Sequence, residues 1–144
     1  MTITFLMLII IDYFNNLMRL IMKRIEELKK DIADLKKQID NFELDPYDYE
    51  GDYCNMLDEQ GYVHIGSLTF SPSEIVRELD ETAYQCGLDD YVDSLDVKDD
   101  SDYQKLEEEL EELEDELADL LEEKEQWINK TNHLSSVFAH NVKE

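Results

Sequence analysis

Cysteine is scarce in this chain of 144 residues, which contains only Cys54 and Cys86. The two cysteines lie 32 positions apart in unlike sequence contexts. This spacing excludes a disulfide framework and a C-x-x-C redox or zinc motif. We therefore expect a reducing compartment, the cytoplasm.

Basic residues are also few, with 13 Lys and Arg against 37 Asp and Glu and a formal net charge of −24. Binding nucleic acid over a broad surface requires clustered Lys and Arg, so the composition argues against direct nucleic-acid binding. Hydrophobic residues make up 42% of the chain, which is too many for a disordered acidic tail. We expect one folded domain of ordinary size.

An apolar run long enough for a membrane is missing as well. Residues 1–11, MTITFLMLIII, are similar to the core of a signal peptide, but no basic residue precedes them and no small-residue cleavage site follows. Asp12, Asn15, Asn16 and Arg19 interrupt the run before the roughly 20 apolar residues that a bilayer span requires. We expect neither a signal peptide nor a membrane span.

Two segments carry a heptad pattern, in which apolar residues recur at alternating steps of three and four. The first pattern consists of Ile11, Phe14, Met18, Ile21, Ile25, Leu28, Ile32, Leu35, Ile39 and Phe42. The second consists of Tyr103, Leu106, Leu110, Leu113, Leu117 and Leu120, followed by Lys124 at the next position and then Trp127. Each pattern predicts a long helix.

The residues beside the two apolar seams have complementary charges, basic on the first helix and acidic on the second. Like flanking positions meet in an antiparallel coiled coil, so Lys36 is expected to face Glu107 and Lys29 to face Glu114. The same register covers the apolar N-terminal end with a second apolar group, Trp127, Ile128, Leu134, Val137 and Phe138.

Two other interpretations of residues 1–21 stay open. Met22 begins the segment MKRIEELKKDI, which is typical of a natural start, so the residues before it could be an untranslated extension. Alternatively, they form a self-association patch, because an exposed apolar run of this size seldom lies bare on a monomer. We favour a packed or oligomeric end because the heptad phase continues through Phe14 and Met18.

The middle segment, residues 43–102, carries 18 acidic and only 2 basic residues. A short helix is expected at CNMLDEQ, and a β-hairpin at YVHI and SLTF around Gly66. The sequence SPSE at 71–74 predicts a capped helix, followed by a helix from Glu81 to Gly87 and another over DDYVDSL. The expected core consists of Ile75, Leu79, Ala83, Tyr84, Leu88, Tyr91, Val92 and Leu95.

These patterns together predict a mainly α fold, a long antiparallel coiled-coil helical hairpin with a small α+β insertion between its arms. Residues 1–42 form the first arm, and residues 103–144 form the second, acidic arm. Residues 43–102 are the compact acidic insertion, built from a short β-hairpin and two or three short helices.

Most of the middle segment follows one pattern of residues and expected elements. A leucine and two acids come first, then a short hairpin and a capped helix, then Asp, Ala and Tyr, and finally Asp, Tyr and Asp. The run reads LDEQGYVHIGSLTFSPSEIVRELDETAYQCGLDDYVDSL. In this pattern it resembles a module of small uncharacterised acidic proteins of bacteriophages and mobile elements. The resemblance covers residues 56–95, about a quarter of the chain. It implies a phage or prophage origin, the cytoplasm of an infected or lysogenic bacterium, and no established activity.

Motifs for catalysis and metal binding are missing from the sequence. A calcium-loop alignment places Pro46 and Leu57 at ligand positions, and the three histidines lack the spacing of a zinc helix. No G-x-S-x-G, GKS or G-x-G-x-x-G motif occurs. We interpret Asp80, Asp89 and Asp93 as residues near helix starts that cap free amides. We expect no enzyme activity, cofactor or metal.

The acidic surface is the feature that points to a function. From Glu107 to Glu125, 12 of 19 residues are carboxylates, one per about 2.4 Å of helix axis. B-DNA presents one charge per about 1.7 Å, and such a field attracts basic clefts. We expect the surface to block the nucleic-acid-binding site of a basic host protein, as a DNA mimic and anti-defence inhibitor. The alternative is a structural or adaptor coiled-coil protein that forms a homo-oligomer through its arms or its apolar N-terminus, its acidity serving solubility.

The residues that carry these two hypotheses form two groups. The candidate interaction surface consists of Glu107, Glu108, Glu109, Glu111, Glu112, Glu114, Asp115, Glu116, Asp119, Glu122, Glu123, Asp89, Asp90 and Asp93. The coiled-coil seam consists of Ile25, Leu28, Ile32, Leu35, Ile39, Leu106, Leu110, Leu113, Leu117 and Leu120.

Overall fold

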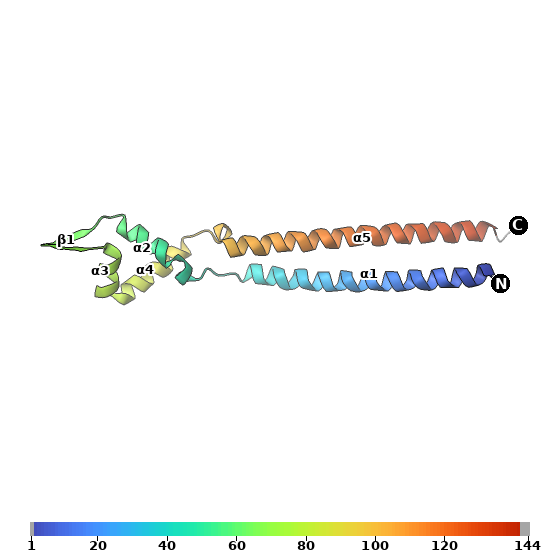
Figure 1. Cartoon of the computed structure of the whole chain (residues 1–144), viewed down its shortest axis with the longest axis horizontal. Coiled ribbons are helices and arrows are strands. Elements are labelled where there is room, and N and C mark those ends of the chain that lie inside the picture. Colours follow the sequence, from blue (N-terminus) through green and yellow to red (C-terminus); the bar gives the residue numbers. More distant parts are fainter. Residues whose placement is uncertain (1, 142–144) are drawn as a thin grey trace. The chain divides into compact units, whose positions relative to one another are not determined.

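The structure of this chain, a computed structural model, describes residues 2–141, without the side chains of residues 2–4, 6, 7, 138 and 141. The chain divides into two compact units, an arm unit (Met1–Asp40 with Lys105–Glu144) and a head unit (Asn41–Gln104). The elements follow in the order α1 (Thr2–Asp40), η1 (Pro46–Tyr49), α2 (Glu50–Asp58), β1 (Val63–Ile65), β2 (Leu68–Phe70), α3 (Pro72–Leu79), α4 (Glu81–Asp93), η2 (Val97–Asp99) and α5 (Ser101–Asn141) (Figure 1).

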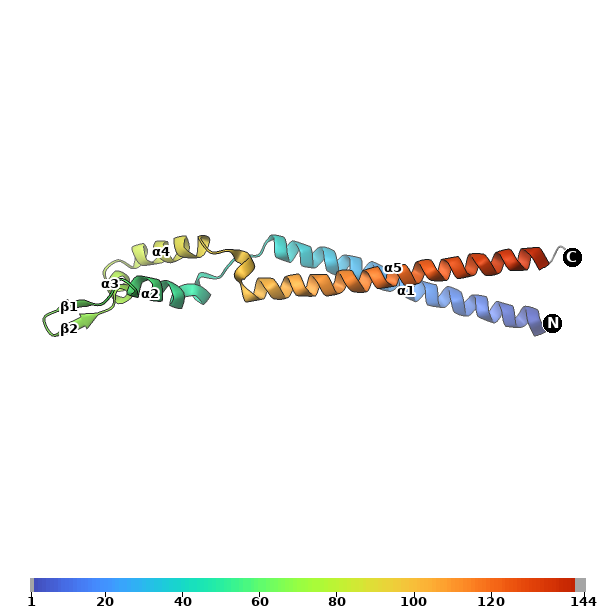
Figure 2. The same cartoon turned by 90° about the horizontal axis from the view of Figure 1, so that it is seen from above.

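The arm unit is a helical hairpin in which the long helix α1 packs on the long helix α5, as predicted. Neither helix contains Gly or Pro, so no residue interrupts its backbone hydrogen bonds. Figures 1 and 2 show the two helices running in opposite directions. The seam residues buried on α1 are Ile21, Ile25, Leu28, Ile32 and Leu35. The half-buried seam residues are Ile39, Leu106, Leu110, Leu113, Leu117 and Leu120.

Ion pairs join the two helices, and the partner of Lys36 differs from the one expected. Lys36 Nζ lies 2.6 Å from a carboxylate oxygen of Glu114, and Arg24 donates two hydrogen bonds to Glu116 at 2.9 and 3.0 Å. The expected pairs of Lys36 with Glu107 and of Lys29 with Glu114 do not form among the described residues. A lysine and a glutamate both have long, flexible side chains, so a lysine between two glutamates one heptad apart can pair with either. The heptad pattern therefore predicts which side of the seam carries the ion pair, but not which glutamate takes part in it.

The apolar N-terminal end of α1 is less covered than the sequence predicts. The Trp127 ring lies against the Phe14 ring, with centroids 6.1 Å apart. Beyond this contact, the side chains that remain exposed include Phe5, Leu8, Ile9, Ile10, Ile11, Leu134 and Val137. The side chain of Phe138 lies outside the described part of the chain. Residues 8–11 are apolar on every face of the helix, and a single neighbouring helix covers only one face.

The head unit contains the expected hairpin and the expected capped helix. Strands β1 and β2 pair antiparallel, with Val63 opposite Phe70 and Ile65 opposite Leu68. Gly66 has a φ of 62° in the connecting turn, a left-handed conformation that favours glycine. The Ser71 side chain and the α3 residue Glu74 form a capping box, as the sequence predicts.

The core of the head unit consists of Tyr53, Tyr84, Leu88 and Val92, surrounded by half-buried apolar side chains of α2, α3 and α4. Three of these four residues were expected in the core. The predictions for Leu79 and Ala83 are wrong, because both side chains are exposed. Both lie near the α3–α4 junction, where residue periodicity alone does not specify which face a neighbouring helix covers.

Helix α4 is a single helix from Glu81 to Asp93, so the predicted break at Gly87 is wrong. The Tyr53 ring lies where a side chain on residue 87 would stand, and a Cβ there would lie 3.1 Å from its Cζ atom. The glycine therefore admits an aromatic ring from α2 and does not end the helix. Asp89 and Asp93 consequently lie inside α4, and the interpretation of both as caps is also wrong.

Candidate functional site

The α5 acidic face comprises the twelve carboxylates between residues 107 and 125, all of which are exposed. It contains every α5 residue of the predicted interaction surface, together with Glu125. Among the described residues, ion pairs from α1 reach only Glu114 and Glu116. Two further members accept hydrogen bonds within the helix, Glu122 from Gln126 Nε2 at 3.1 Å and Glu123 from Trp127 Nε1 at 3.4 Å.

The positions of these carboxylates follow from the heptad pattern. Leucines take the seam positions, and Glu114 and Glu116 take the two flanks that meet α1. The acids at the remaining positions stand farther from α1 on the helix surface, namely Glu108, Glu111, Glu112, Asp115, Asp119, Glu122 and Glu125. The arrangement offers a row of anionic hydrogen-bond acceptors with little internal neutralisation.

The three aspartates of the predicted surface, Asp89, Asp90 and Asp93, lie on α4 in the head unit. Their side chains are exposed. These aspartates belong to the head unit, whereas the α5 acidic face belongs to the arm unit. The nearby Asp80 does act as a helix cap, since its side chain accepts a hydrogen bond from Ala83 N at 2.9 Å.

A polar cluster in the head unit was not foreseen from the sequence. Arg77 donates to Glu50 at 2.7 Å and to the Tyr84 hydroxyl at 2.5 Å, and its guanidinium carbon lies 4.6 Å from the Tyr84 ring centroid. The Cys54 sulfur lies 3.1 Å from the same hydroxyl. Burial, followed by the hydrogen bonds with Cys54 and Glu50, raises the pKa of Tyr84 to about 12, although the hydrogen bond from Arg77 acts in the opposite direction.

This cluster has a structural role, because it joins α2, α3 and α4 and holds a phenol that stays protonated. It contains no histidine, and its carboxylate, Glu50, is already paired with Arg77. The signal that could have found it is Arg77 itself, one of only two basic residues in residues 43–102. A lone cation in an acidic, tyrosine-rich segment is expected to pair internally.

Two aspartates join distant parts of the head unit and were also missed. Asp58 accepts hydrogen bonds from Ser73 N at 2.8 Å and from Ser73 Oγ at 3.0 Å, so the end of α2 caps the start of α3. Asp100 accepts from Asp102 N at 2.8 Å and also from the Tyr49 hydroxyl. The hydrogen bond to Asp100 is the main cause that raises the pKa of Tyr49 to about 12.

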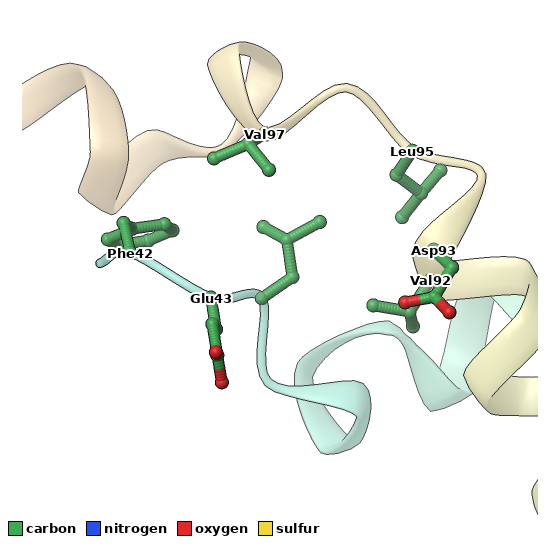
Figure 3. Close-up of a pocket in the computed structure, with 7 residues that line it drawn as sticks. Phe42, Glu43, Val92, Asp93, Leu95 and Val97 are labelled. Atoms are coloured by element: carbon green, nitrogen blue, oxygen red, sulfur yellow. The ribbon is translucent and has the colours of Figure 1, made fainter. Parts of the chain in front are cut away.

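One cavity of about 340 Å³ lies within the head unit, beside the end of α4. Figure 3 shows the side chains of Val92, Leu95 and Val97 directed toward this space, while the carboxylate of Glu43 points away from it. The remaining lining residues are Phe42, Leu44 and Asp93. The lining is mainly apolar, and its two ionisable residues are the carboxylates Glu43 and Asp93.

A second hollow of about 480 Å³ lies between the hairpin and α3. It is lined by four apolar residues and two glutamates, namely Ile65, Phe70, Ile75, Leu79, Glu74 and Glu78. We call it the hairpin groove. Sequence reasoning missed it, because it depends on how the hairpin lies against α3.

Neither a metal site nor a membrane-spanning helix is found in the described part of the chain. Within it, no group of three or more His, Cys, Asp or Glu side chains could hold a metal ion. None of its helices is both long enough and apolar enough to cross a bilayer. Comparisons with protein-family models, curated proteins and solved structures found no match.

Proposed function

We propose that this chain acts by binding another protein, with its α5 acidic face occupying a basic site that normally holds DNA or RNA. In this role the chain is a DNA mimic. The observation that carries the proposal is that all twelve carboxylates of the face are exposed and that, within the described part of the chain, ion pairs to α1 engage only two of them. Ten carboxylates thus remain available to cations of a partner.

The arm hairpin supports this role by holding the charges in place. An α-helix spaces its residues at about 1.5 Å along its axis, and packing against α1 as an antiparallel coiled coil would keep α5 extended. A partner would then meet a preformed row of charges and would lose less conformational freedom on binding. Attraction between this row and a basic cleft also speeds encounter.

The biological setting of the proposal comes from the pattern of residues 56–95, which resembles modules of phage and mobile-element proteins. An accessory protein that inhibits a nucleic-acid-binding defence protein in the cytoplasm of a bacterial host fits this setting. The chain would inhibit its partner by occupying the nucleic-acid-binding site, and this needs no catalytic group.

The test captures partners from bacterial lysate on the immobilised full chain and elutes them with excess duplex DNA. A DNA-binding protein that the duplex releases, and whose retention falls at least about tenfold between 0.05 and 0.5 M salt, supports the proposal. Retention should fall similarly in a variant with four neutralised acids on α5, Glu108→Gln, Glu112→Gln, Asp115→Asn and Asp119→Asn.

The matched control neutralises four exposed acids of α1 instead, Glu26→Gln, Asp31→Asn, Asp34→Asn and Asp40→Asn. It changes the net charge by the same amount and should retain the partner. Partner binding that is insensitive to salt, or that is lost equally in both variants, would sink the mimic hypothesis.

A second candidate function is structural, with the chain acting as an adaptor that self-associates. The observation that favours it is the exposed apolar end of α1, where Phe5, Leu8 and Leu20 all face solvent. Only two charged residues, Asp12 and Arg19, lie within residues 1–22. Two copies of a chain with a net charge of −24 can therefore approach at this end with little repulsion.

Sedimentation equilibrium distinguishes this candidate from the first. Self-association through the apolar end should persist or strengthen at high salt and should be lost in the variant Ile9→Glu with Ile10→Glu. A chain that stays monomeric at all concentrations and salt levels would rule out the adaptor role and leave the mimic proposal untouched.

A further inference from the structure

The β-hairpin of the head unit has one apolar face and one polar face. The pairing register places Val63, Ile65, Leu68 and Phe70 on the same side. His64 and Thr69 lie on the opposite side, where His64 Nδ1 and Thr69 Oγ1 are 3.0 Å apart. Such alternation is typical of a sheet that covers an apolar partner with one face.

The head unit itself leaves most of this apolar face uncovered. Ile65 is 63% exposed and Leu68 is 58% exposed, while Phe70 alone on this face is half-buried. On the adjacent helix, Leu79 is 81% exposed. A hairpin of two three-residue strands has little stability in water without such cover. The cover must therefore come from outside the head unit.

The hairpin groove, defined above, is the part of this surface that is concave. Its apolar lining comes from two elements, with Ile65 and Phe70 on the hairpin and Ile75 and Leu79 on α3. A hollow lined mainly by apolar residues of two different elements suits an amphipathic helix laid into a groove.

The charges around the groove determine which kind of helix fits. Glu74 and Glu78 line it, and Glu78 makes no hydrogen bond or ion pair with other described residues. The whole head unit has 18 acidic residues and two basic ones, of which Arg77 is engaged with Glu50. A second head unit would bring like charges together, whereas a segment with Lys or Arg beside its apolar residues would be attracted.

We infer that the hairpin groove binds an amphipathic helix of a partner protein, with apolar residues on one face and Lys or Arg beside them. Leu79 and Ile65 are the contacts for the apolar face, and Glu78 receives a basic side chain at the rim. This site lies in the head unit, and it is independent of the α5 acidic face and of the function proposed for that face.

The experiment measures binding of three fluorescent synthetic helical peptides to the full chain by anisotropy at about 0.15 M salt. One peptide is built from Leu and Lys, one from Ser and Lys with the same charge, and one from Leu and Glu. The Leu–Lys peptide should bind at least about tenfold more tightly than either of the others, because only it satisfies both the apolar lining and the rim.

Two variants assign that binding to the groove. Leu79→Ser combined with Ile65→Thr should weaken the Leu–Lys peptide at least about tenfold. The matched control, Tyr47→Ser with Tyr62→Ser, removes two exposed aromatic side chains of the head unit outside the groove and should leave the affinity unchanged. Glu78→Lys should weaken binding more than Glu59→Lys, which reverses a charge elsewhere on the head unit.

Three results would overturn the inference. If the groove variant binds the Leu–Lys peptide as tightly as the wild type does, the peptide is responding only to the overall acidity. If the Leu–Glu peptide binds equally well, the rim charges do not select the partner. If sedimentation shows a dimer that the groove variant abolishes, the groove is covered by a second copy of this chain.

Discussion

The Tyr53 ring lies against Gly87 in the middle of α4, where a Cβ on residue 87 would stand 3.1 Å from the ring atom Cζ. Tyr53 is buried, and its ring centroid lies 5.4 Å from that of Tyr84 and 5.7 Å from that of Tyr91. The missing side chain at Gly87 thus allows α2 to place an aromatic ring directly on the backbone of α4.

Gly87→Ala is expected to destabilise the head unit by about 1–3 kcal/mol, because the added methyl group overpacks the contact with Tyr53. This loss outweighs the difference in helix propensity, which at an exposed helix position favours alanine over glycine by about 1 kcal/mol. Hydrogen exchange of the α4 amides in the full chain measures the change for this unit alone.

The control is Gly51→Ala in α2, where a Cβ would meet no atom within 4 Å. This change should be neutral or stabilising by up to about 1 kcal/mol. Adding Tyr53→Phe to Gly87→Ala should recover part of the lost stability, because the hydroxyl oxygen is also close to the new methyl group. Equal effects of the two glycine substitutions would contradict the packing explanation.

Gly87 also shows why part of the fold could not be predicted from the sequence. A glycine after a short periodic segment is a usual helix stop signal. Its actual partner, Tyr53, lies in another helix, and local pattern carries no information about that contact. The helices of the arm unit, in contrast, follow from a pattern that repeats over many heptads, so errors at single positions do not change the result.

The candidate sites also differ in how far they can be predicted from the sequence. The exposure of the α5 carboxylates follows from their heptad positions, because residues off the seam of a helix face water. The hairpin groove and the caps provided by Asp58 and Asp100 depend on tertiary placement. The ion-pair partners of Lys36 and Arg24 depend on the conformations of long side chains, which the heptad pattern does not specify.

Asp58→Ala is expected to destabilise the head unit by about 1–2 kcal/mol, because it removes the acceptor for both the backbone amide and the hydroxyl of Ser73. The exposed neighbour Glu59 provides the control, and Glu59→Ala should change stability by less than about 0.5 kcal/mol. Hydrogen exchange at the first turn of α3 should report the loss first. Unchanged exchange there in Asp58→Ala would show that the cap is dispensable.

Leu28→Ala is expected to destabilise the arm unit by about 2–5 kcal/mol, because Leu28 is fully buried, with 0% exposure, in the seam between α1 and α5. Leu20→Ala on the same helix changes a side chain that is 65% exposed and should cost less than about 0.5 kcal/mol. Thermal unfolding followed by helical circular dichroism compares the two. Similar melting temperatures for both variants would show that α1 and α5 do not form this seam in solution.

Alkaline pH is expected to destabilise the head unit between pH 10 and pH 12. The hydrogen bond to Asp100 raises the pKa of Tyr49 from its ordinary 10.0 to about 12, and burial, the largest cause at Tyr84, raises that pKa to about 12 as well. A phenol whose pKa is higher in the folded state than in the unfolded state contributes its full stabilisation at pH values below its pKa in the unfolded state. This stabilisation is lost as the pH rises through its pKa in the folded state. Tyr49→Phe combined with Tyr84→Phe should therefore flatten the fall in melting temperature over this window. An equally steep fall in the double variant, or tyrosinate absorbance that rises fully near pH 10 in the wild type, would refute this assignment.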